Sequence, residues 1–543
     1  MSASQSPGWN FADLWEAIAG QIPDALCQRQ GEREVTWAEF DRRANGVAAS
    51  LVAAPGAAEQ DKVAQYLYNC PEYLESVFAA FKAGMAVVNT NYRYAANELV
   101  YLWENGDVTA VVFHGAFTDR IEAVRARVPR ITTWLWVDDG DGDCPAWATP
   151  YEVAASAGTS EPTVAPWGRS PDHLLLLYTG GTTGMPKGVM WRQDDLFGIL
   201  DMNNRKRMPP EQDLDAVATR ITTAGPRNMP SAPLMHGTGL FNAISNLMIG
   251  GSITSMESRS FSPEEFLDTV QRYEINSTAI VGDAFAKPIL AALDAAPDRW
   301  DISSLRVMVS SGVIWSKQTK DGLLRYNDRL IMVDALGSSE AVGMATNTTT
   351  SDSGGETARF ELGPNTRVVT DPTPNEPSRD VVPGSGELGR VAIRGRTPIG
   401  YYKDEAKSAE TFVVIDGDRY SIPGDYATVE EDGTVNLKGR GSQCINTGGE
   451  KVYPEEVEEC LKLHESVLDA AVVGLPDDKW GEAINALVEL HPGAALDEQA
   501  LRDHVKENLA AYKAPKRVIE ISTIGRAANG KLDYKALKAM AAS

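Results

Sequence analysis

One loop of the sequence combines the residue types that bind phosphate. An apolar run, Leu174–Tyr178, leads into a segment with four glycines, three threonines and one lysine. Glycine lets backbone N–H groups approach an anion closely, hydroxyls donate hydrogen bonds to phosphate oxygens, and lysine adds positive charge. A purely structural turn is the alternative, which so dense a cluster after a buried strand disfavours. The loop therefore predicts a phosphate site made by Thr179, Gly180, Gly181, Thr182, Thr183, Gly184 and Lys187.

This loop is not a Walker A motif, because Lys187 follows Pro186 and precedes Gly188. The one near match, Gly525–Lys531, is followed by Leu532 and lacks the hydroxyl that would hold magnesium. A P-loop NTPase is therefore disfavoured.

The string YTGGTTGMPKG resembles the signature loop of adenylate-forming enzymes, the superfamily of acyl-CoA synthetases, luciferases and peptide-synthetase adenylation domains. Further motifs follow in the family's order, so the resemblance covers nearly the whole chain. It implies a ligase that uses ATP, Mg²⁺ and coenzyme A in two half-reactions. A carboxylate attacks the α-phosphate of ATP to give acyl-adenylate and pyrophosphate, and the CoA thiol then displaces AMP.

Two segments resemble the family's adenine and α-phosphate motifs. Ala335–Glu340 is similar to YGxTE, which implies that Ser339 contacts the α-phosphate and that Glu340 holds Mg²⁺, a hard cation that prefers oxygen ligands. Leu336 replaces the tyrosine that packs on adenine in the family. Ser310–Gly312 resembles the adenine-side loop. The nucleotide-binding residues implied by the two segments are Ser311, Gly312, Leu336, Gly337, Ser338 and Ser339.

The resemblance also assigns ribose and CoA contacts near a domain boundary. Asp425, in YSIPGD, and Arg440, in KGRGS, match the residues that reach the ribose hydroxyls. Ser442 matches the family's hinge, so we expect an N-terminal domain over residues 1–440 and a mobile C-terminal domain over 441–543. In the latter, Gly448 and Gly449 would lie beside the pantetheine arm, and Lys451 would meet a CoA phosphate or remain a solvated lysine.

Lys531, in NGKL, matches the lysine that bridges the substrate carboxylate and the α-phosphate. These two reactants repel each other, so an ammonium group between them stabilises the charge that develops in the transition state. From Tyr512 to Lys538 there are seven Lys or Arg residues against two acidic ones. The segment is thus locally basic, as an ATP site on an acidic protein requires.

The acyl side of the site is predicted from one histidine motif and one apolar run. His236, in PLMHG, resembles the histidine that closes the PLxH motif and gates the acyl group, although local context does not distinguish it from His114 in FHG. Asp283 lies in an apolar run, where an unpaired carboxylate is costly, and is either a helix cap or an acyl-site residue. The predicted acyl-site residues are His236, Gly237, Gly239, Gly282, Asp283 and Val313; the predicted catalytic residues are Lys531, Glu340 and His236.

Longer strings, such as GYYKDEAKSAETF and INTGGEKVYPEEVE, are similar to a bacterial subgroup that acts on fatty acids and steroid side-chain carboxylates. A bulky apolar acid is therefore the expected substrate, with a short or aromatic acid as the alternative. A module that loads a carrier protein is a second alternative, but we expect no carrier domain after Ser543. A non-enzymatic binding protein is a third, but it would be expected to lose Lys531 or Glu340.

The length, composition and charge of the chain limit the classes of protein that it can belong to. The chain has 543 residues, 43% of them apolar, and a formal charge of −24, which excludes overall disorder and argues against nucleic-acid binding. Five cysteines without a CxxC pair predict reduced thiols rather than disulfides or structural zinc. With no secretory signal and no long apolar span, we expect a cytoplasmic protein without a membrane span. The oligomeric state is left open, a homodimer being one option.

Alternating elements are expected to position these residues. Asn10 caps a predicted helix that contains Asp13, and short apolar runs such as Thr133–Val137 alternate with helical stretches such as Ala96–Glu104. The fold class is α/β: two α/β sub-units and a small β-rich sub-unit near Ser351–Glu387, then a small α+β domain whose first helix begins at Pro454.

Overall fold

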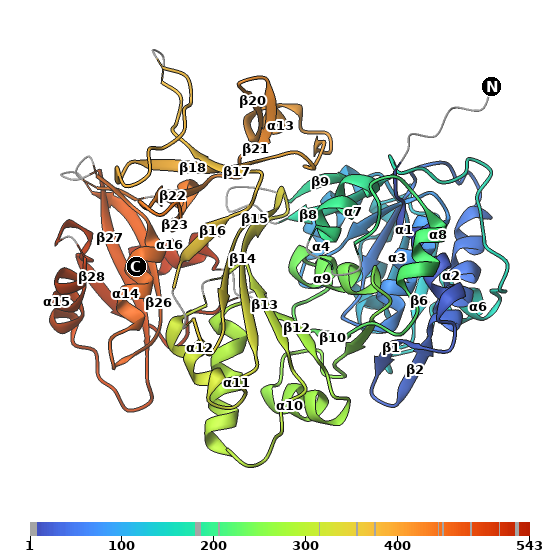
Figure 1. Cartoon of the computed structure of the whole chain (residues 1–543), viewed down its shortest axis with the longest axis horizontal. Coiled ribbons are helices and arrows are strands. Elements are labelled where there is room, and N and C mark those ends of the chain that lie inside the picture. Colours follow the sequence, from blue (N-terminus) through green and yellow to red (C-terminus); the bar gives the residue numbers. More distant parts are fainter. Residues whose placement is uncertain are drawn as a thin grey trace. The chain divides into compact units, whose positions relative to one another are not determined.

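A computed structural model describes residues 8–179, 186–202, 204, 207–313, 315–353, 357–373, 376–443, 445–447, 450–477, 481–509, 511–526 and 532–543. The chain forms two compact units (Figure 1). Unit 1 comprises Met1–Gly343, Thr348–Gly355 and Arg394–Val413, and unit 2 comprises Met344–Asn347, Glu356–Ile393 and Val414–Ser543. This division follows packing and does not locate a hinge, so the domain boundary between residues 440 and 441 stays a prediction.

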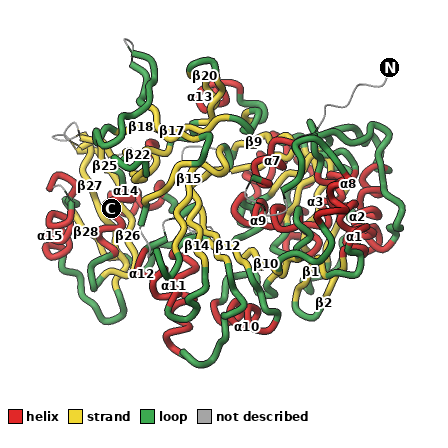
Figure 2. Tube along the Cα trace, viewed as in Figure 1, coloured by secondary structure: helices red, strands yellow, loops and turns green. Residues whose placement is uncertain are grey.

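Unit 1 contains an eight-stranded sheet with the order β19-β9-β8-β4-β3-β5-β6-β7. From β8 to β7 neighbouring strands are parallel, whereas β9 and β19 are antiparallel. Helices and strands alternate along this part of the chain, as the apolar runs predicted; Figure 2 colours the helices red and the strands yellow. The strands are β3 (Lys62–Tyr66), β4 (Ala86–Asn89), β5 (Val108–His114), β6 (Thr133–Val137), β7 (Thr149–Pro150), β8 (Leu174–Thr179), β9 (Lys187–Arg192) and β19 (Gly400–Tyr401).

Seven strands of a second, larger sheet belong to unit 1 in the order β2-β1-β11-β10-β12-β13-β14, and all neighbours from β1 to β14 are parallel. Met308 and Met332 on one face pack in a core with Ile289 of α11 (Asp283–Ala295) and Leu323 of α12 (Lys317–Leu324). The strands are β1 (Leu26–Gln30), β2 (Arg33–Thr36), β10 (Arg227–Pro230), β11 (Ser252–Ser255), β12 (Ser277–Ile280), β13 (Val307–Ser311) and β14 (Ile331–Ser338).

The helices of unit 1 begin where the sequence offers caps. The side chain of Asn10 accepts a hydrogen bond from the backbone N–H of Asp13 at 2.9 Å, as predicted for the first helix. The helices are α1 (Phe11–Gln21), α2 (Trp37–Val52), α3 (Pro71–Lys82), α4 (Ala96–Asn105), α5 (Thr118–Glu122), α6 (Tyr151–Ser156), α7 (Gln193–Asp201), α8 (Leu214–Arg220), α9 (Gly237–Leu247), α10 (Pro263–Arg272), α11 (Asp283–Ala295), α12 (Lys317–Leu324) and α13 (Glu405–Thr411).

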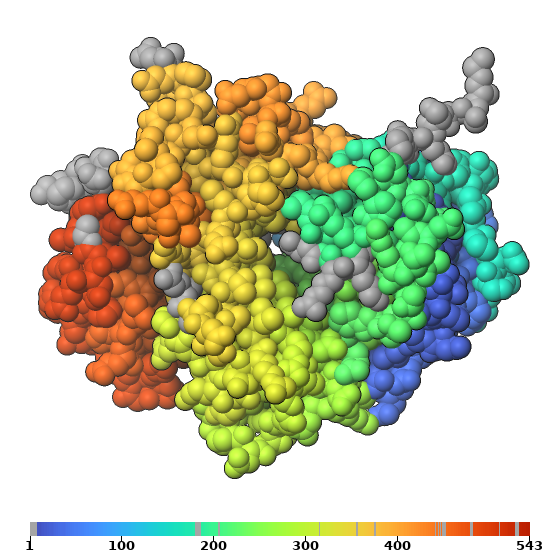
Figure 3. All heavy atoms as spheres, in the orientation of Figure 1, coloured from blue at the N-terminus to red at the C-terminus, as the bar shows by residue number. Residues whose placement is uncertain are grey.

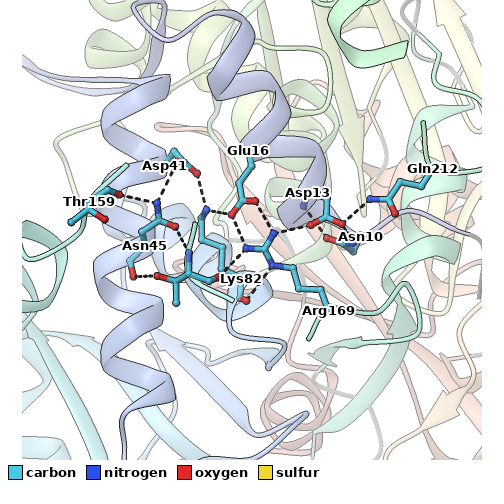
Figure 4. Close-up of polar contacts among 10 residues, drawn as sticks. Asn10, Asp13, Glu16, Asp41, Asn45, Lys82, Thr159, Arg169 and Gln212 are labelled. Carbon is cyan, nitrogen blue, oxygen red and sulfur yellow. Dashed lines mark hydrogen bonds and ion pairs between the residues drawn. The ribbon is translucent and has the colours of Figure 1, made fainter. Parts of the chain in front are cut away.

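A buried ionic cluster joins the first three helices (Figure 4). Lys82 of α3 is 0% exposed and pairs with Glu16 of α1 and, at 2.7 Å, with Asp41 of α2. Arg169 pairs with Asp13 at 2.7 Å and with Glu16 at 2.6 Å. Burial raises the pKa of Asp41, and Lys82 opposes that rise. Two buried cations thus balance carboxylates from α1 and α2, which ties the start of the chain to α3.

Unit 2 contains two β-rich parts. In the first, strands follow the order β15-β16-β23-β22-β18-β21-β20, with β17 beside β18. Only the middle of β15, Met344–Asn347, belongs to unit 2. These strands are β15 (Ala341–Thr349), β16 (Arg359–Leu362), β17 (Thr366–Val369), β18 (Leu388–Arg394), β20 (Phe412–Ile415), β21 (Asp418–Ser421), β22 (Asp425–Val429) and β23 (Val435–Arg440). The predicted β-rich character of this part of the chain is confirmed.

The last part of unit 2 is a five-stranded sheet with helices. Its strands are β24 (Ile445–Thr447), β25 (Glu450–Val452), β26 (Val467–Asp477), β27 (Gly481–Leu490) and β28 (Arg517–Glu520). Its helices are α14 (Pro454–Lys462), α15 (Glu498–Asn508) and α16 (Tyr534–Ala542). Val457, Val472 and Leu501 share one core. The α+β prediction and the start of its first helix at Pro454 are confirmed.

Candidate active site

The predicted nucleotide residues of unit 1 lie at the carboxyl ends of parallel strands. Thr179 ends β8, Ser311 ends β13, and Leu336 to Ser338 form the end of β14. In open α/β sheets ligands bind at this edge, because the loops that leave the strands there gather polar groups. The structure therefore places these residues where a nucleotide site is expected in an α/β sheet.

Within unit 1 a buried asparagine links the end of β8 to the segment that precedes His236. Asn89 ends β4 and is 3% exposed. Its Nδ2 donates to the carbonyl oxygens of Tyr178 at 2.9 Å and Met235 at 2.6 Å, and its Oδ1 accepts from the N–H of Tyr178 at 2.5 Å. One amide thus links the end of β8 to the turn before His236. Our sequence reasoning missed Asn89; the signal was a polar residue that ends the apolar run Ala86–Val88.

Two more side chains make long-range hydrogen bonds to the segments that hold predicted site residues. Asn69 Oδ1 accepts from the N–H of Leu234 at 2.7 Å, and Trp191 Nε1 donates to the carbonyl of Ser339 at 2.9 Å. The segment that holds His236 and the segment that holds Glu340 are therefore both tied to the first sheet of unit 1.

The two histidines that the motifs left undecided differ in setting. His114 is 5% exposed, and its Nδ1 accepts from the N–H of Tyr68 at 3.1 Å. Burial lowers the pKa of His114. His236 is half-buried at the N-cap of α9. At Gly239, in the first turn of α9, a Cβ would meet the carbonyl oxygen of Pro233 at 2.4 Å, so glycine is required there. His114 is thus buried and bonded to the backbone of Tyr68, and the acyl-gating role of His236 stays a prediction.

Glu340 and Lys187 both contact the short segment around β19. Tyr401 Oη donates to Glu340 Oε1 at 2.8 Å. Lys187 Nζ forms an ion pair with Asp404 Oδ2 and lies 5.9 Å from the centroid of the Tyr401 ring. The hydrogen bond from Lys187 holds the pKa of Asp404 below its usual value. The predicted metal ligand Glu340 and the predicted phosphate-loop lysine Lys187 therefore contact the same short segment.

Asp283 bridges two helix starts rather than capping its own helix. Its Oδ1 accepts from Ser316 N and from Ser316 Oγ, each at 3.1 Å, so α11 is tied to the start of α12. The preceding Gly282 has φ +50°, and its N–H donates to Ser310 Oγ at 2.8 Å. Val313 is half-buried nearby in the same core region. Acyl contacts by Gly237, Gly282, Asp283 and Val313 stay predictions.

Strands β13 and β14 each have one buried face and one more exposed face. Met308, Ser310 and Met332 are buried, whereas Val307, Val309 and Val333 on the opposite face are half-exposed. Register pairs Val307 with Ile331 and Val309 with Val333, so these side chains form one apolar strip. At about 3.3 Å per residue the strip runs for roughly 13 Å away from Ser311 and Ala335.

In unit 2 the two predicted ribose residues lie on neighbouring strands. Asp425 of β22 and Arg440 of β23 are register partners, and Asp425 is 5% exposed. The structure describes the backbone of Arg440, Ser442 and Lys451 but not their side chains. Outside the described residues lie Gly180, Gly181, Thr182, Thr183, Gly184, Gly448, Gly449 and Lys531.

A buried cluster in unit 2 surrounds Arg526, which precedes the NGKL motif by three residues. Arg526 Nε and Nη2 donate to Asp469 at 2.6 and 2.9 Å. Glu458 Oε1 accepts from the N–H of Val472 at 2.8 Å and from Tyr534 Oη at 3.3 Å. Burial raises the pKa of Glu458 to about 7, although Arg526 opposes that rise. Both described ends of the NGKL segment are therefore packed against β26 and α14.

This cluster predicts a pH dependence of stability. The folded protein keeps a proton on Glu458 that the unfolded chain releases above its ordinary pKa of 4.5, so stability should fall as the pH rises from 4.5 to about 7. Glu458→Gln removes that loss. We expect the variant to gain about 2–3 kcal/mol relative to the wild type between pH 5 and pH 8 in urea unfolding. Glu465 is exposed, so Glu465→Gln is the control. If stability depended on pH in the same way in both variants, the assignment of the pH dependence to Glu458 would be contradicted.

Among the described residues no group of three or more His, Cys, Asp or Glu side chains could hold a metal ion. Glu340 does fit a hydrated Mg²⁺, which commonly takes one carboxylate from the protein and the rest of its oxygens from water and phosphate. None of the helices in the described part of the chain is both long and apolar enough to cross a membrane.

Comparisons with known proteins agree with the motifs. Residues 15–402 match the model of the AMP-binding enzyme family, and residues 456–531 match that of the AMP-binding enzyme C-terminal domain. The medium/long-chain-fatty-acid–CoA/3-oxocholest-4-en-26-oate–CoA ligase of Mycobacterium tuberculosis is 38% identical, over 97% of this chain and 95% of the relative. The 3-oxocholest-4-en-26-oate–CoA ligase of Rhodococcus rhodochrous is 37% identical, with the same coverage.

Solved structures share the fold. The anthranilate CoA ligase AuaEII, in complex with anthranoyl-AMP, superimposes with a TM-score of 0.83 at 20% identity over 99% of this chain and 98% of that one. ATP-bound MatB from Rhodopseudomonas palustris gives a TM-score of 0.79 at 24% identity, over 98% and 99%. The predicted fold class, with a large N-terminal and a small C-terminal part, is confirmed. The chain belongs to the AMP-binding enzyme family, within the adenylate-forming acyl-CoA ligases.

Proposed function

We propose that the protein is an ATP-dependent carboxylic acid–CoA ligase that acts on a bulky apolar acid, such as a fatty acid or a steroid side-chain carboxylate. The observation that carries the proposal is identity of 37–38% across nearly the whole chain with ligases named for such acids. Mycobacterium avium has a further relative, a medium-chain acyl-CoA ligase, at 35% identity.

The residues divide the work between two half-reactions. Lys187 and the loop after Thr179 would bind the β- and γ-phosphates, and Glu340 would hold Mg²⁺. Bound Mg²⁺ would neutralise charge on the triphosphate. Asp425 and Arg440 would bind the ribose, and Lys531 would bring the acid carboxylate to the α-phosphate. In the second half-reaction Gly448 and Gly449 would lie along the CoA arm.

The apolar strip supports an apolar acyl group. Val307, Val309 and Val333 lead away from Ser311 and Ala335, at the end of the sheet where the nucleotide residues lie. Covering such side chains is favourable by about 25 cal/mol per Å² of apolar area, whereas a charged acyl tail would lose hydration there. The strip therefore favours fatty or steroid acids over amino acids.

AMP release should be measured with CoA and a panel of short, medium, long, aromatic and steroid carboxylates. We expect kcat/KM to be at least tenfold higher for medium, long or steroid acids than for acetate or benzoate, since each added buried CH₂ contributes about 0.8 kcal/mol. Failure on every apolar acid would overturn the substrate assignment.

Hydroxamate trapping without CoA separates the alternatives. Adenylate that forms without any thioester to CoA would favour a carrier-loading module, and absence of both products would favour a binding protein. A preference for benzoate or another small aromatic acid would replace the bulky substrate with an aromatic one.

A further inference from the structure

The segment Gly400–Asp404 contacts two predicted ATP-site side chains and has no assigned role. Its first two residues form β19, which pairs with β9 through Gly400 and Met190 and through Tyr401 and Val189. The N–H of Tyr402 donates to the carbonyl of Gly188 at 2.8 Å. Figure 3 shows orange atoms, the colour of residues near 400, next to green atoms, the colour of residues near 200. The segment is therefore attached to the strand that begins at the phosphate-loop lysine.

Tyr401 lies between the two groups. It is 7% exposed, its Oη donates to Glu340 Oε1 at 2.8 Å, and its ring centroid lies 5.9 Å from Lys187 Nζ. Its N–H donates to Ser408 Oγ at 2.8 Å, and that hydroxyl also donates to the carbonyl of Asp404 at 2.7 Å. The hydrogen bond to Ser408 thus fixes the backbone of Tyr401, so its hydroxyl can orient the Glu340 carboxylate.

Asp404 uses its two carboxylate oxygens for different purposes. Oδ1 accepts from the N–H of Lys407 at 3.0 Å and caps α13, whereas Oδ2 pairs with Lys187 Nζ. The side chains of Lys187 and Asp404 are 36% and 30% exposed, so water and ions can compete for the pair. An exposed ion pair contributes only about 0–1 kcal/mol, so a triphosphate can displace Asp404 from the lysine at small cost.

We propose that Tyr401 and Asp404 are positioning residues of the triphosphate site: Asp404 holds Lys187 in an ion pair that the β- and γ-phosphates displace, and Tyr401 orients Glu340 towards Mg²⁺. The inference rests on the proposed function, because it needs ATP as the ligand. It adds that Tyr401 and Asp404 set the affinity for ATP and the requirement for Mg²⁺.

The neighbouring residues supply matched controls. Tyr402 Oη donates to Asp107 Oδ2 at 2.8 Å, and Lys403 Nζ pairs with the same oxygen at 2.7 Å. Tyr402→Phe therefore removes the same kind of bond from the same segment, and Asp107→Asn removes the same kind of ion pair. These two bonds involve neither Lys187 nor Glu340. Asparagine is as good a helix cap as aspartate, so Asp404→Asn should keep α13 intact.

ATP and AMP affinities measured by calorimetry test the role of Asp404. We expect Asp404→Asn to lower the Kd for ATP about two- to fivefold, the range that an exposed ion pair allows, and to leave the Kd for AMP unchanged. In a Lys187→Gln background Asp404→Asn should have no effect, because the cation that it frees is gone. Equal effects on ATP and AMP, or persistence of the effect without Lys187, would overturn this role.

The ratio of ATP affinities with and without Mg²⁺ tests the role of Tyr401. A hydrogen bond to a charged group contributes about 1.5–3 kcal/mol, so Tyr401→Phe should reduce the Mg²⁺-dependent gain in ATP affinity by roughly tenfold or more. The Mg²⁺ concentration for half-maximal AMP release should rise, and Tyr402→Phe should match the wild type. If the wild type bound no ATP, the proposed function would fail and this inference with it. If the wild type formed acyl-CoA while all four single variants behaved alike, only this inference would fail.

Discussion

Lys531→Ala should reduce pyrophosphate exchange about 10²- to 10³-fold, because removal of one group that stabilises developing charge costs that much in comparable sites. The acid and ATP are both anionic, and Lys531 is the residue that the family motif places between them. Thioester formation from preformed acyl-adenylate and CoA should be little changed, since the carboxylate is already joined to AMP as a mixed anhydride. The two half-reactions therefore need separate assays.

Lys535 provides the control for this experiment. It lies four residues later, in α16, and is exposed. Lys535→Ala removes the same charge from the same basic segment, so it shows how much of the loss comes from net charge alone. Equal losses in the two variants would assign the effect to the basic segment. Intact pyrophosphate exchange with loss of thioester formation alone would move Lys531 to the second half-reaction.

The fold was largely predictable because its signals are local. Asn10 before an apolar-periodic segment, the run Thr133–Val137, and Pro454 before two glutamates each determine an element through nearest neighbours in the chain. The observed α1, β6 and α14 begin where these signals place them. The apolar run Leu174–Tyr178 also predicted a strand before the phosphate loop, and β8 ends one residue later, at Thr179.

The supporting residues of the site were not predictable in the same way. Asn89, Tyr401 and Asp404 are of common types, and each acts on residues far away in the chain: Tyr401 contacts Glu340, and Asp404 contacts Lys187. No spacing rule connects such positions, because strand order brings them together. Asp283 shows the same limit, since its partner Ser316 lies on the next strand–helix connection.

The buried ionic cluster near the start of the chain affects the stability of the protein mainly when one of its members is lost. A buried ion pair contributes little net stability, because desolvation of both charges offsets their attraction. Removal of one partner is different, since it leaves the other charge buried and uncompensated. In this cluster the partners come from α1, α2 and α3, so the loss would affect the packing of all three helices.

Lys82→Met should therefore destabilise the protein by about 3–5 kcal/mol, although methionine fills much of the same volume. Asp41 would lose its cation, and protonation would relieve part of the penalty because burial already raises its pKa. The loss should consequently be smaller at pH 5 than at pH 8 in urea unfolding. Arg125→Ala, which breaks an exposed pair with Glu122, should leave the urea unfolding curve nearly unchanged. A loss at Lys82 that did not vary with pH would show that packing, rather than buried charge, determines the stability of this region.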